Sequence, residues 1–165
     1  MTPDEVQEIL DLQDPRTSVV PFSSTFLNLM KLGLSDKGML TQIPGYKEFL
    51  DEASRIGYGY CVIDEGRPIV CFGIVMQWPH VAECWLIPDT ERIKVWRHRS
   101  HKDSSRFFEE AASRLDLHRI HVTVDVDNPV ALKWITRMKF KKEAVLQKYS
   151  YNEKDMVMYS RLFVR

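Results

Sequence analysis

Apolar residues recur at two spacings along this chain of 165 residues, and the spacing changes near Gly57. Tyr46 to Ile56 repeats apolar residues at helical spacing and stops at that glycine, which predicts a helix with a glycine end. The sequence then becomes strand-like, with a turn signal at Asp64-Glu65-Gly66-Arg67. Three runs form an expected antiparallel meander: Tyr58 to Ile63, Pro68 to Met76 and Val81 to Ile87.

The flanking segments predict further helices and strands. Thr2-Pro3-Asp4-Glu5 is a helix start, and we expect that helix to end near Asp14-Pro15. Other expected elements are a strand from Ser18 to Phe22, a helix from Ser24 to Leu32, a helix capped by Ser104 or Ser105, a strand from Arg119 to Val126, a helix from Pro129 to Met138, and strands from Ala144 to Tyr151 and Met156 to Val164. This order predicts an α/β (α+β) fold with helices on the faces of a mixed sheet.

Composition is that of a globular protein, with 44% hydrophobic and 28% charged residues. The length suits one domain, residues 1–165, with a helical portion at 1–57 and a core at 58–165. No run is long and apolar enough for a membrane span, and acidic residues at the N-terminus disfavour a signal peptide. We therefore expect a cytoplasmic protein without membrane contact. The scattered cysteines, Cys61, Cys71 and Cys84, are interpreted as buried thiols rather than disulfide or metal ligands.

Charge is distributed unevenly although the net charge is zero. Residues 1–89 carry 6 Lys and Arg against 13 Asp and Glu, whereas residues 90–165 carry 17 against 10. A basic half of this kind indicates an anionic partner, which can be a phosphorylated cofactor, a nucleic acid or an acidic protein.

Val124 to Phe140 resembles the end of a GNAT (N-acetyltransferase superfamily) domain, where a strand ends in Asn and a helix follows. The matching residues are Asn128, Ala131, Met138, Lys139 and Phe140. Asn128 suits a helix cap, and Pro129 suits the first turn. The resemblance covers residues 58–165 and implies a GNAT-like, mostly antiparallel mixed sheet with helices on both faces. It also implies acetyl-CoA as the cofactor and no metal.

The segment aligned with the family's cofactor loop lacks the expected glycines. Such loops usually read Arg/Gln-x-x-Gly-x-Gly/Ala, so that backbone N–H groups reach the pyrophosphate. Here Arg99 fills the basic position, but Ser100, Lys102 and Ser104 stand where glycine is common. The alternative for this stretch is a solvated basic loop or a protein contact. The cofactor-binding residues implied by the resemblance are Ile87, Arg97, Arg99, Ser100, Lys102, Ser104, Ser105 and Asn128.

Glu83 matches the place of the general base in one branch of the family, and burial there raises the pKa of a carboxyl group. An outward-facing strand residue or an ion pair is its structural alternative.

The family's proton-donating Tyr is replaced by Ile135, so this role is vacant unless a tyrosine from another strand supplies it: Tyr149, Tyr151 or Tyr159. His118 and His121 are interpreted as surface or structural histidines.

Two functions follow, an acetyl-CoA-dependent N-acetyltransferase of small molecules or proteins and a GNAT-shaped protein with weak or lost cofactor binding. Residues 81–140 also resemble the glycine-poor GNAT-like proteins of short-tailed bacteriophages, which favours the second. That resemblance implies other phage structural proteins as partners, in the cytoplasm of an infected host and in the virion. Nucleic-acid binding by the basic loop, with Trp96 among its cations, is a third and weaker interpretation.

Overall fold

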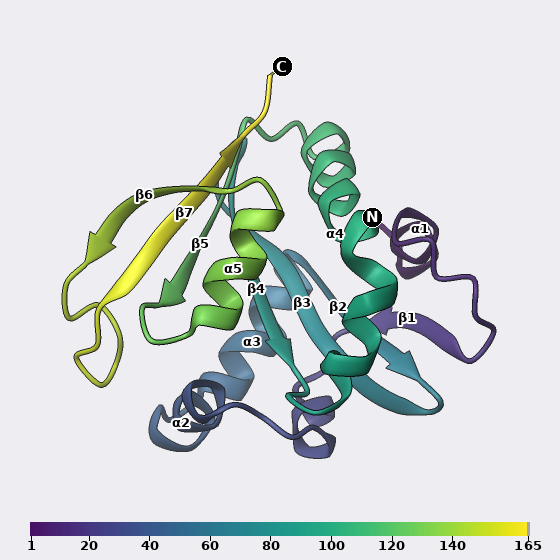
Figure 1. Ribbon diagram of the computed structural model, residues 1–165, viewed down its shortest axis with the longest axis horizontal. Helices are drawn as coiled ribbons and strands as arrows, with labels where there is room; N and C mark the ends of the chain where they lie inside the picture. Colours follow the sequence, from purple (N-terminus) through teal and green to yellow (C-terminus); the bar gives the residue numbers. More distant parts are fainter. Residues whose placement is uncertain (165) are drawn as a thin grey trace. The chain divides into compact units, whose positions relative to one another are not determined.

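The computed structural model describes residues 1–164, without the side chains of residues 95–103 (Figure 1). The helices are α1 Pro3–Ile9, α2 Leu34–Gln42, α3 Tyr46–Ile56, α4 Arg92–Arg114 and α5 Pro129–Arg137, with the 3₁₀ helix η1 Ser24–Leu29. The strands are β1 Thr17–Pro21, β2 Tyr58–Asp64, β3 Arg67–Trp78, β4 Val81–Pro88, β5 Arg119–Asp125, β6 Lys141–Leu146 and β7 Met156–Leu162.

Hydrogen bonds join the strands in the order β1-β2-β3-β4-β5-β7-β6. The pairs β1–β2, β2–β3, β5–β7 and β6–β7 are antiparallel, whereas β4 and β5 are parallel. The predicted mixed, mostly antiparallel sheet is therefore confirmed. Within the described part of the chain, no helix has the length and apolar character that a membrane span requires.

The chain forms two compact units that are each discontinuous in sequence. Unit 1 consists of Met1–Val75 and Trp85–Phe107, and unit 2 consists of Met76–Cys84 and Phe108–Arg165. Strands β3 and β4 contribute residues to both units. This division does not test the expectation of one domain, which stays a prediction.

Unit 1 has an apolar core between the strands and the segments that carry η1, α2 and α3. Leu27, Met30, Leu50 and Ile87 pack there with the thiols of Cys61 and Cys71. All three cysteines of the chain are free and buried, as predicted. Asp51 on α3 anchors η1, because its carboxylate accepts hydrogen bonds from the backbone N–H of Ser24 at 2.7 Å and from its hydroxyl at 2.6 Å.

Unit 2 buries one face of β5 and β7 under helices. Ile120 on β5 pairs with Arg161 on β7, and the Arg161 guanidinium donates to the carbonyl of Met138 at the end of α5, at 3.3 Å. Phe108 on α4 contacts the ring of Phe140 edge to face, with centroids 5.0 Å apart. Because partners in an antiparallel pair project to the same side, this is the face of Ile120, and His121 projects to the other.

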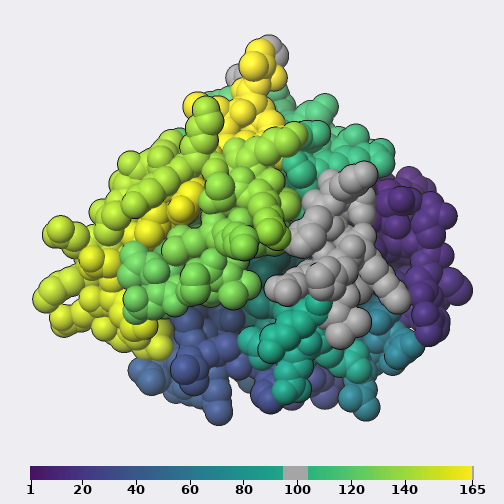
Figure 2. Space-filling view, viewed as in Figure 1, coloured from purple at the N-terminus to yellow at the C-terminus, as the bar shows by residue number. Residues whose placement is uncertain are grey.

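Strand β6 lies at the edge of the sheet, beside β7 (upper left of Figure 1). Its residues from Lys141 to Val145 are all exposed, and they belong to the yellow-green surface in Figure 2. The strand begins before the predicted Ala144 and ends before Tyr151. Lysines on an exposed edge discourage pairing with a further strand, which explains why this polar segment is stable there.

The helices differ most from the sequence prediction. Helix α2 was not predicted. None of its residues is buried, and its sequence carries no apolar face that would have indicated a helix. Helix α1 ends at Ile9 rather than near Asp14, and the expected second helix is a 3₁₀ turn. Helix α4 starts at Arg92. The expectation that Ser104 or Ser105 caps it is therefore wrong.

Gly73 on β3 is required because a side chain there has no space. A Cβ atom at Gly73 would lie 2.6 Å from both the indole Nε1 of Trp85 and the carbonyl oxygen of Tyr58. We expect Gly73→Ala to lower the free energy of unfolding by about 1–3 kcal/mol, because the backbone and the indole must move. Urea unfolding measures this change.

Gly33→Ala is the matched control, since a Cβ atom there would make ordinary contacts at 3.7 Å to Asp36 and Thr90. Only a small loss, roughly a few tenths of a kcal/mol, is expected because alanine is the poorer N-cap residue. Equal losses in the two variants would contradict the packing argument for Gly73.

Candidate functional site

The parallel pairing of β4 with β5 is short and ends at two ionisable residues. Val81, Ala82 and Glu83 pair with Arg119, Ile120 and His121 in register. Glu83 and His121 are thus the last pair before the ladder stops.

Glu83 is half-buried on β4, and its carboxylate accepts a hydrogen bond from the Gln77 side chain at 2.7 Å. Burial raises the pKa of Glu83 above its usual value, and the hydrogen bond from Gln77 opposes this rise only in part. Among the described residues, no ion pair with Glu83 is present. Glu83 therefore holds a proton more readily than an ordinary carboxyl group does, because burial disfavours its charged form.

His121 is the residue that sequence reasoning undervalued. It is 8% exposed, and its Nδ1 atom is buried without a hydrogen-bond partner. Burial lowers the pKa of His121, and the positive charge of Arg119 lowers it further. A neutral imidazole therefore lies beside Glu83 on the strand ladder. The sequence left a surface or a structural histidine open at this position, and the structure places His121 in the interior.

A polar network on β5, β6 and β7 adjoins His121. Ser160 pairs with His121, and its hydroxyl donates to the Glu143 carboxylate at 2.6 Å. Arg119 donates to both oxygens of Glu143, at 2.8 and 2.6 Å. The hydrogen bonds from Arg119 and Ser160 lower the pKa of Glu143 to about 2. Glu143 is therefore ionised at any physiological pH, and it fixes the Arg119 guanidinium next to His121.

Asn128 caps α5 as predicted, because its side-chain oxygen accepts from the Ala131 N–H at 3.0 Å. Ile135, at the family's tyrosine position, is 2% exposed and belongs to the core. Tyr159 pairs with Val122, so it projects to the face opposite His121. Tyr149 and Tyr151 are exposed in the connection between β6 and β7. Of these tyrosines, Tyr159 therefore projects to the helix-covered face of unit 2, the side of α5, which carries Ile135.

The connection from β4 to α4 contains a buried carboxylate, that of Asp89. Asp89 is 4% exposed, and its carboxylate accepts hydrogen bonds from the backbone N–H groups of Glu91 at 3.0 Å, Arg92 at 2.9 Å and Lys31 at 2.8 Å. Burial raises the pKa of Asp89, but these N–H groups outweigh burial and bring it below the usual value. The first N–H groups of α4 therefore already serve a carboxylate.

The described residues that were expected to bind the cofactor do not form a glycine-rich loop. Ile87 is 4% exposed in the core of unit 1, and Ser104 and Ser105 lie inside α4. The remaining expected residues fall outside the described side chains: Arg97, Arg99, Ser100 and Lys102. Glu83 and Asn128 belong to unit 2, whereas Ile87 and Asp89 belong to unit 1.

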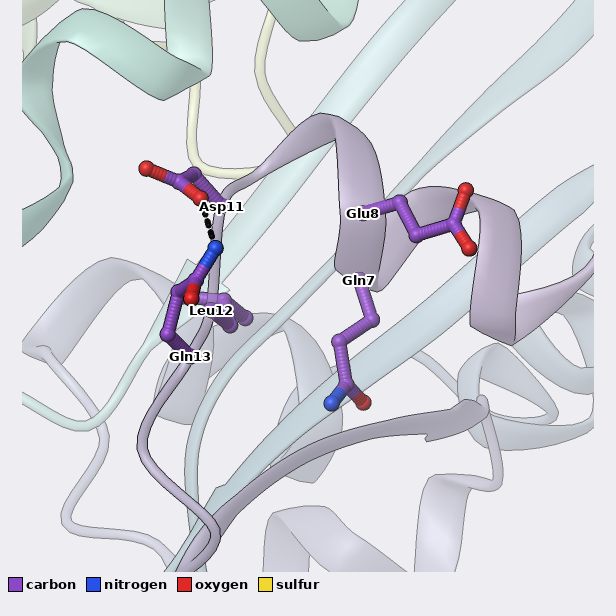
Figure 3. A pocket seen from close by; sticks show the side chains of 5 residues that line it. All are labelled: Gln7, Glu8, Asp11, Leu12 and Gln13. Carbon is purple, nitrogen blue, oxygen red and sulfur yellow. Dashed lines mark hydrogen bonds between the residues drawn. The ribbon is translucent and has the colours of Figure 1, made fainter.

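A hollow of about 280 Å³ lies beside α1 and the turn that follows it (Figure 3). Its lining includes Asp11 and Gln13, which hydrogen-bond to each other at 2.7 Å, and Gln7, whose side-chain oxygen accepts from the Val19 N–H at 3.1 Å. These groups serve turn and strand geometry.

Neither a protein-family model nor a curated protein sequence matches this chain. Solved structures share its fold. Ard1 from Thermoplasma volcanium has a TM-score of 0.68 at 13% identity, covering 91% of this chain and 99% of that chain. A GNAT-family acetyltransferase from Bacillus anthracis has a TM-score of 0.66 at 16% identity, covering 89% and 95%. RimL, a ribosomal-protein alpha-N-acetyltransferase in complex with coenzyme A, has a TM-score of 0.64 at 17% identity, covering 91% and 96%.

The burial of His121 predicts a pH-dependent stability. The unfolded chain binds a proton at histidine near pH ~6.5, whereas the folded chain binds it only at lower pH, so acid favours unfolding below that value. We expect His121→Gln to weaken the loss of unfolding free energy between pH 7.5 and pH 5.5. Urea unfolding across this range measures it. His118→Gln, at an exposed position of the same segment, is the control and should retain the wild-type slope.

Proposed function

We propose that this chain is a GNAT-fold protein that binds acetyl-CoA weakly or not at all and acts through contacts with other proteins. On the resemblance of residues 81–140, these partners are structural proteins of a short-tailed bacteriophage. The chain would then act in the infected host cytoplasm and be incorporated in the virion or used in its assembly. The similarity of the fold to solved GNAT structures supports the first part of this proposal.

One observation carries the proposal, the Asp89 carboxylate at the start of α4. A pyrophosphate at a helix N-terminus uses the same free backbone N–H groups and is attracted by the positive end of the helix. In this chain those N–H groups donate to a fixed negative charge, which also repels a second anion. The described residues at this helix end therefore do not fit a pyrophosphate.

Two sequence features support the same conclusion. No glycine follows Gly73, so nowhere after β3 can a glycine bring the backbone close to a phosphate. Ile135 replaces the proton-donating tyrosine and is buried. Each feature removes a different part of the cofactor chemistry, one at the phosphates and one at the leaving group.

An N-acetyltransferase acting on an amine remains as a second candidate, and Glu83 is the observation that favours it. Its raised pKa and its place at the last β4–β5 pair suit a general base. RimL, which shares the fold, was solved with coenzyme A. Glu83 is thus the residue that an active enzyme would use to take the proton from the amine.

Calorimetric titration with acetyl-CoA separates the two functions. We expect no saturable heat at micromolar cofactor, because Asp89 fills the helix end that a pyrophosphate needs. Micromolar affinity, weakened by Arg99→Glu, would overturn the proposal. The phage assignment has its own test, since mass spectrometry of purified virions should detect the chain, and its absence would count against a virion role.

Asp89→Ala tests the helix end directly. We expect the free energy of unfolding to fall by about 1–3 kcal/mol, because three backbone N–H groups lose their acceptor. Chemical denaturation measures the loss. Glu91→Ala is the neighbouring control, as it removes only an exposed ion pair with Lys31 and should leave stability nearly unchanged. An unchanged free energy of unfolding in Asp89→Ala would show that the carboxylate does not organise this helix end.

A further inference from the structure

Two of the three cysteines are direct partners on neighbouring strands. Cys61 on β2 pairs with Cys71 on β3, and these strands run side by side (Figure 1). Both residues are 0% exposed in the apolar core of unit 1, and both are free thiols. Cys84 is also buried and free, but it belongs to unit 2, whose sequence contains no other cysteine. Cys61 and Cys71 are therefore a pair, whereas Cys84 is alone in its unit.

The hydrogen bonds of β1 show which kind of pair the two cysteines form. The Val19 N–H points away from β2, because it donates to the side chain of Gln7 at 3.1 Å. Val20, the next residue and the partner of Cys61, therefore directs its N–H and C=O groups towards β2. Cys61 accordingly forms its ladder hydrogen bonds with β1. Its pair with Cys71, on the other side of β2, is a non-hydrogen-bonded pair.

Side chains come closest at this kind of pair. Its Cα atoms lie about 4.5 Å apart, and a disulfide joins residues whose Cα atoms are roughly 4.4–6.8 Å apart. A hydrogen bond between the two thiols, together with burial, raises the pKa of Cys71 far above its usual range. The Cys71 Sγ atom also lies 3.7 Å from the Met30 Sδ atom. The backbone separation and the contact between the thiols thus both fit a bond between Cys61 and Cys71.

Oxidation of this pair requires no cavity in the core. Two hydrogen atoms leave when a disulfide forms and no atom is added, so the close packing around the pair is kept. Hydrogen peroxide suits a buried pair, because its transient product, a sulfenic acid, carries a single additional oxygen atom. The raised pKa of Cys71 makes the reactive thiolate scarce, so the reaction is expected to be slow.

We propose that Cys61 and Cys71 form a redox pair that a peroxide converts into a disulfide between β2 and β3. One thiol attacks the peroxide, the O–O bond breaks, and a sulfenic acid forms as one water molecule leaves. The other thiol then displaces the hydroxyl group of the sulfenic acid as a second water molecule, and the S–S bond forms. The thiols lose two electrons and two protons, and the peroxide is reduced to water. The inference goes beyond the proposed function, because it depends on neither acetyl-CoA nor a partner.

Peptide mapping of the folded, whole chain tests the pair. The protein is incubated with excess hydrogen peroxide, the remaining thiols are alkylated in urea, and a protease that cleaves after glutamate is added without reduction. Cleavage after Glu65 and Glu83 places the three cysteines on separate peptides. Mass spectrometry should then detect a peptide cross-linked through Cys61 and Cys71, which dithiothreitol separates, while Cys84 is recovered in its alkylated form.

Two results of this map would overturn the proposal. One is oxidation of Cys61 and Cys71 to sulfinic acids, or their recovery as alkylated thiols, without the cross-link. The other is cross-linking of Cys84 to the same extent as that of Cys61 with Cys71. Cys84→Ala is the matched variant and should retain the cross-link, whereas Cys71→Ala should lose it. The map of the wild-type protein decides the assignment even where a variant fails to fold.

The unfolding transition gives a second readout. The disulfide should raise the midpoint of urea unfolding by roughly 1 M, because it closes a loop in the unfolded chain, and dithiothreitol should reverse the shift. Peroxide also oxidises methionines, so Cys61→Ala treated in the same way measures that effect alone. A midpoint of the oxidised wild type that does not rise relative to this control would contradict the fit of the pair to a disulfide.

Discussion

Asp89 joins three separate segments of unit 1, two of them through its buried carboxylate and one through its backbone N–H. Its oxygens accept from Lys31, which follows η1, and from the first N–H groups of α4, while its own N–H donates to the Ile69 carbonyl on β3 at 2.8 Å. Lys31 adds to the junction, because its carbonyl accepts from the Thr90 N–H at 2.8 Å and from its hydroxyl at 2.9 Å. The start of α4 and the path of the N-terminal segment therefore depend on the same charge.

This constraint explains how α4 can start stably although no glycine follows Gly73 in the sequence. A glycine-rich loop leaves N–H groups free for an external anion, and a helix end without such an anion is stable only if another acceptor is present. Asp89 is that acceptor, so only three residues separate β4 from α4, and the helix needs no ligand to be capped. Stability of the fold and affinity for a phosphate are thereby uncoupled.

The sequence predicted the parts whose signals are local. Alternation identified the strands, Gly57 marked the end of α3, and Asn128 with Pro129 marked the start of α5. The start of α4 was missed although its cap is local, since Asp89 accepts from the N–H groups of Glu91 and Arg92; only its further bond from Lys31 joins residues 58 positions apart. Similarly, Glu83 was found from its place in an apolar strand, but the burial of His121 arises from pairing with β4 and β7, which no single segment shows.

The two buried or half-buried carboxylates, Asp89 and Glu83, have opposite electrostatic environments. At the start of α4 a carboxylate is stabilised in its charged form by backbone N–H groups, and its pKa is lowered. At Glu83 a carboxylate has a single neutral partner, and burial raises its pKa. His121, whose pKa is lowered by burial and by the charge of Arg119, pairs with Glu83 on the strand ladder. Backbone N–H groups thus favour the charged form of Asp89, whereas burial disfavours the charged form of Glu83, although both are carboxylates.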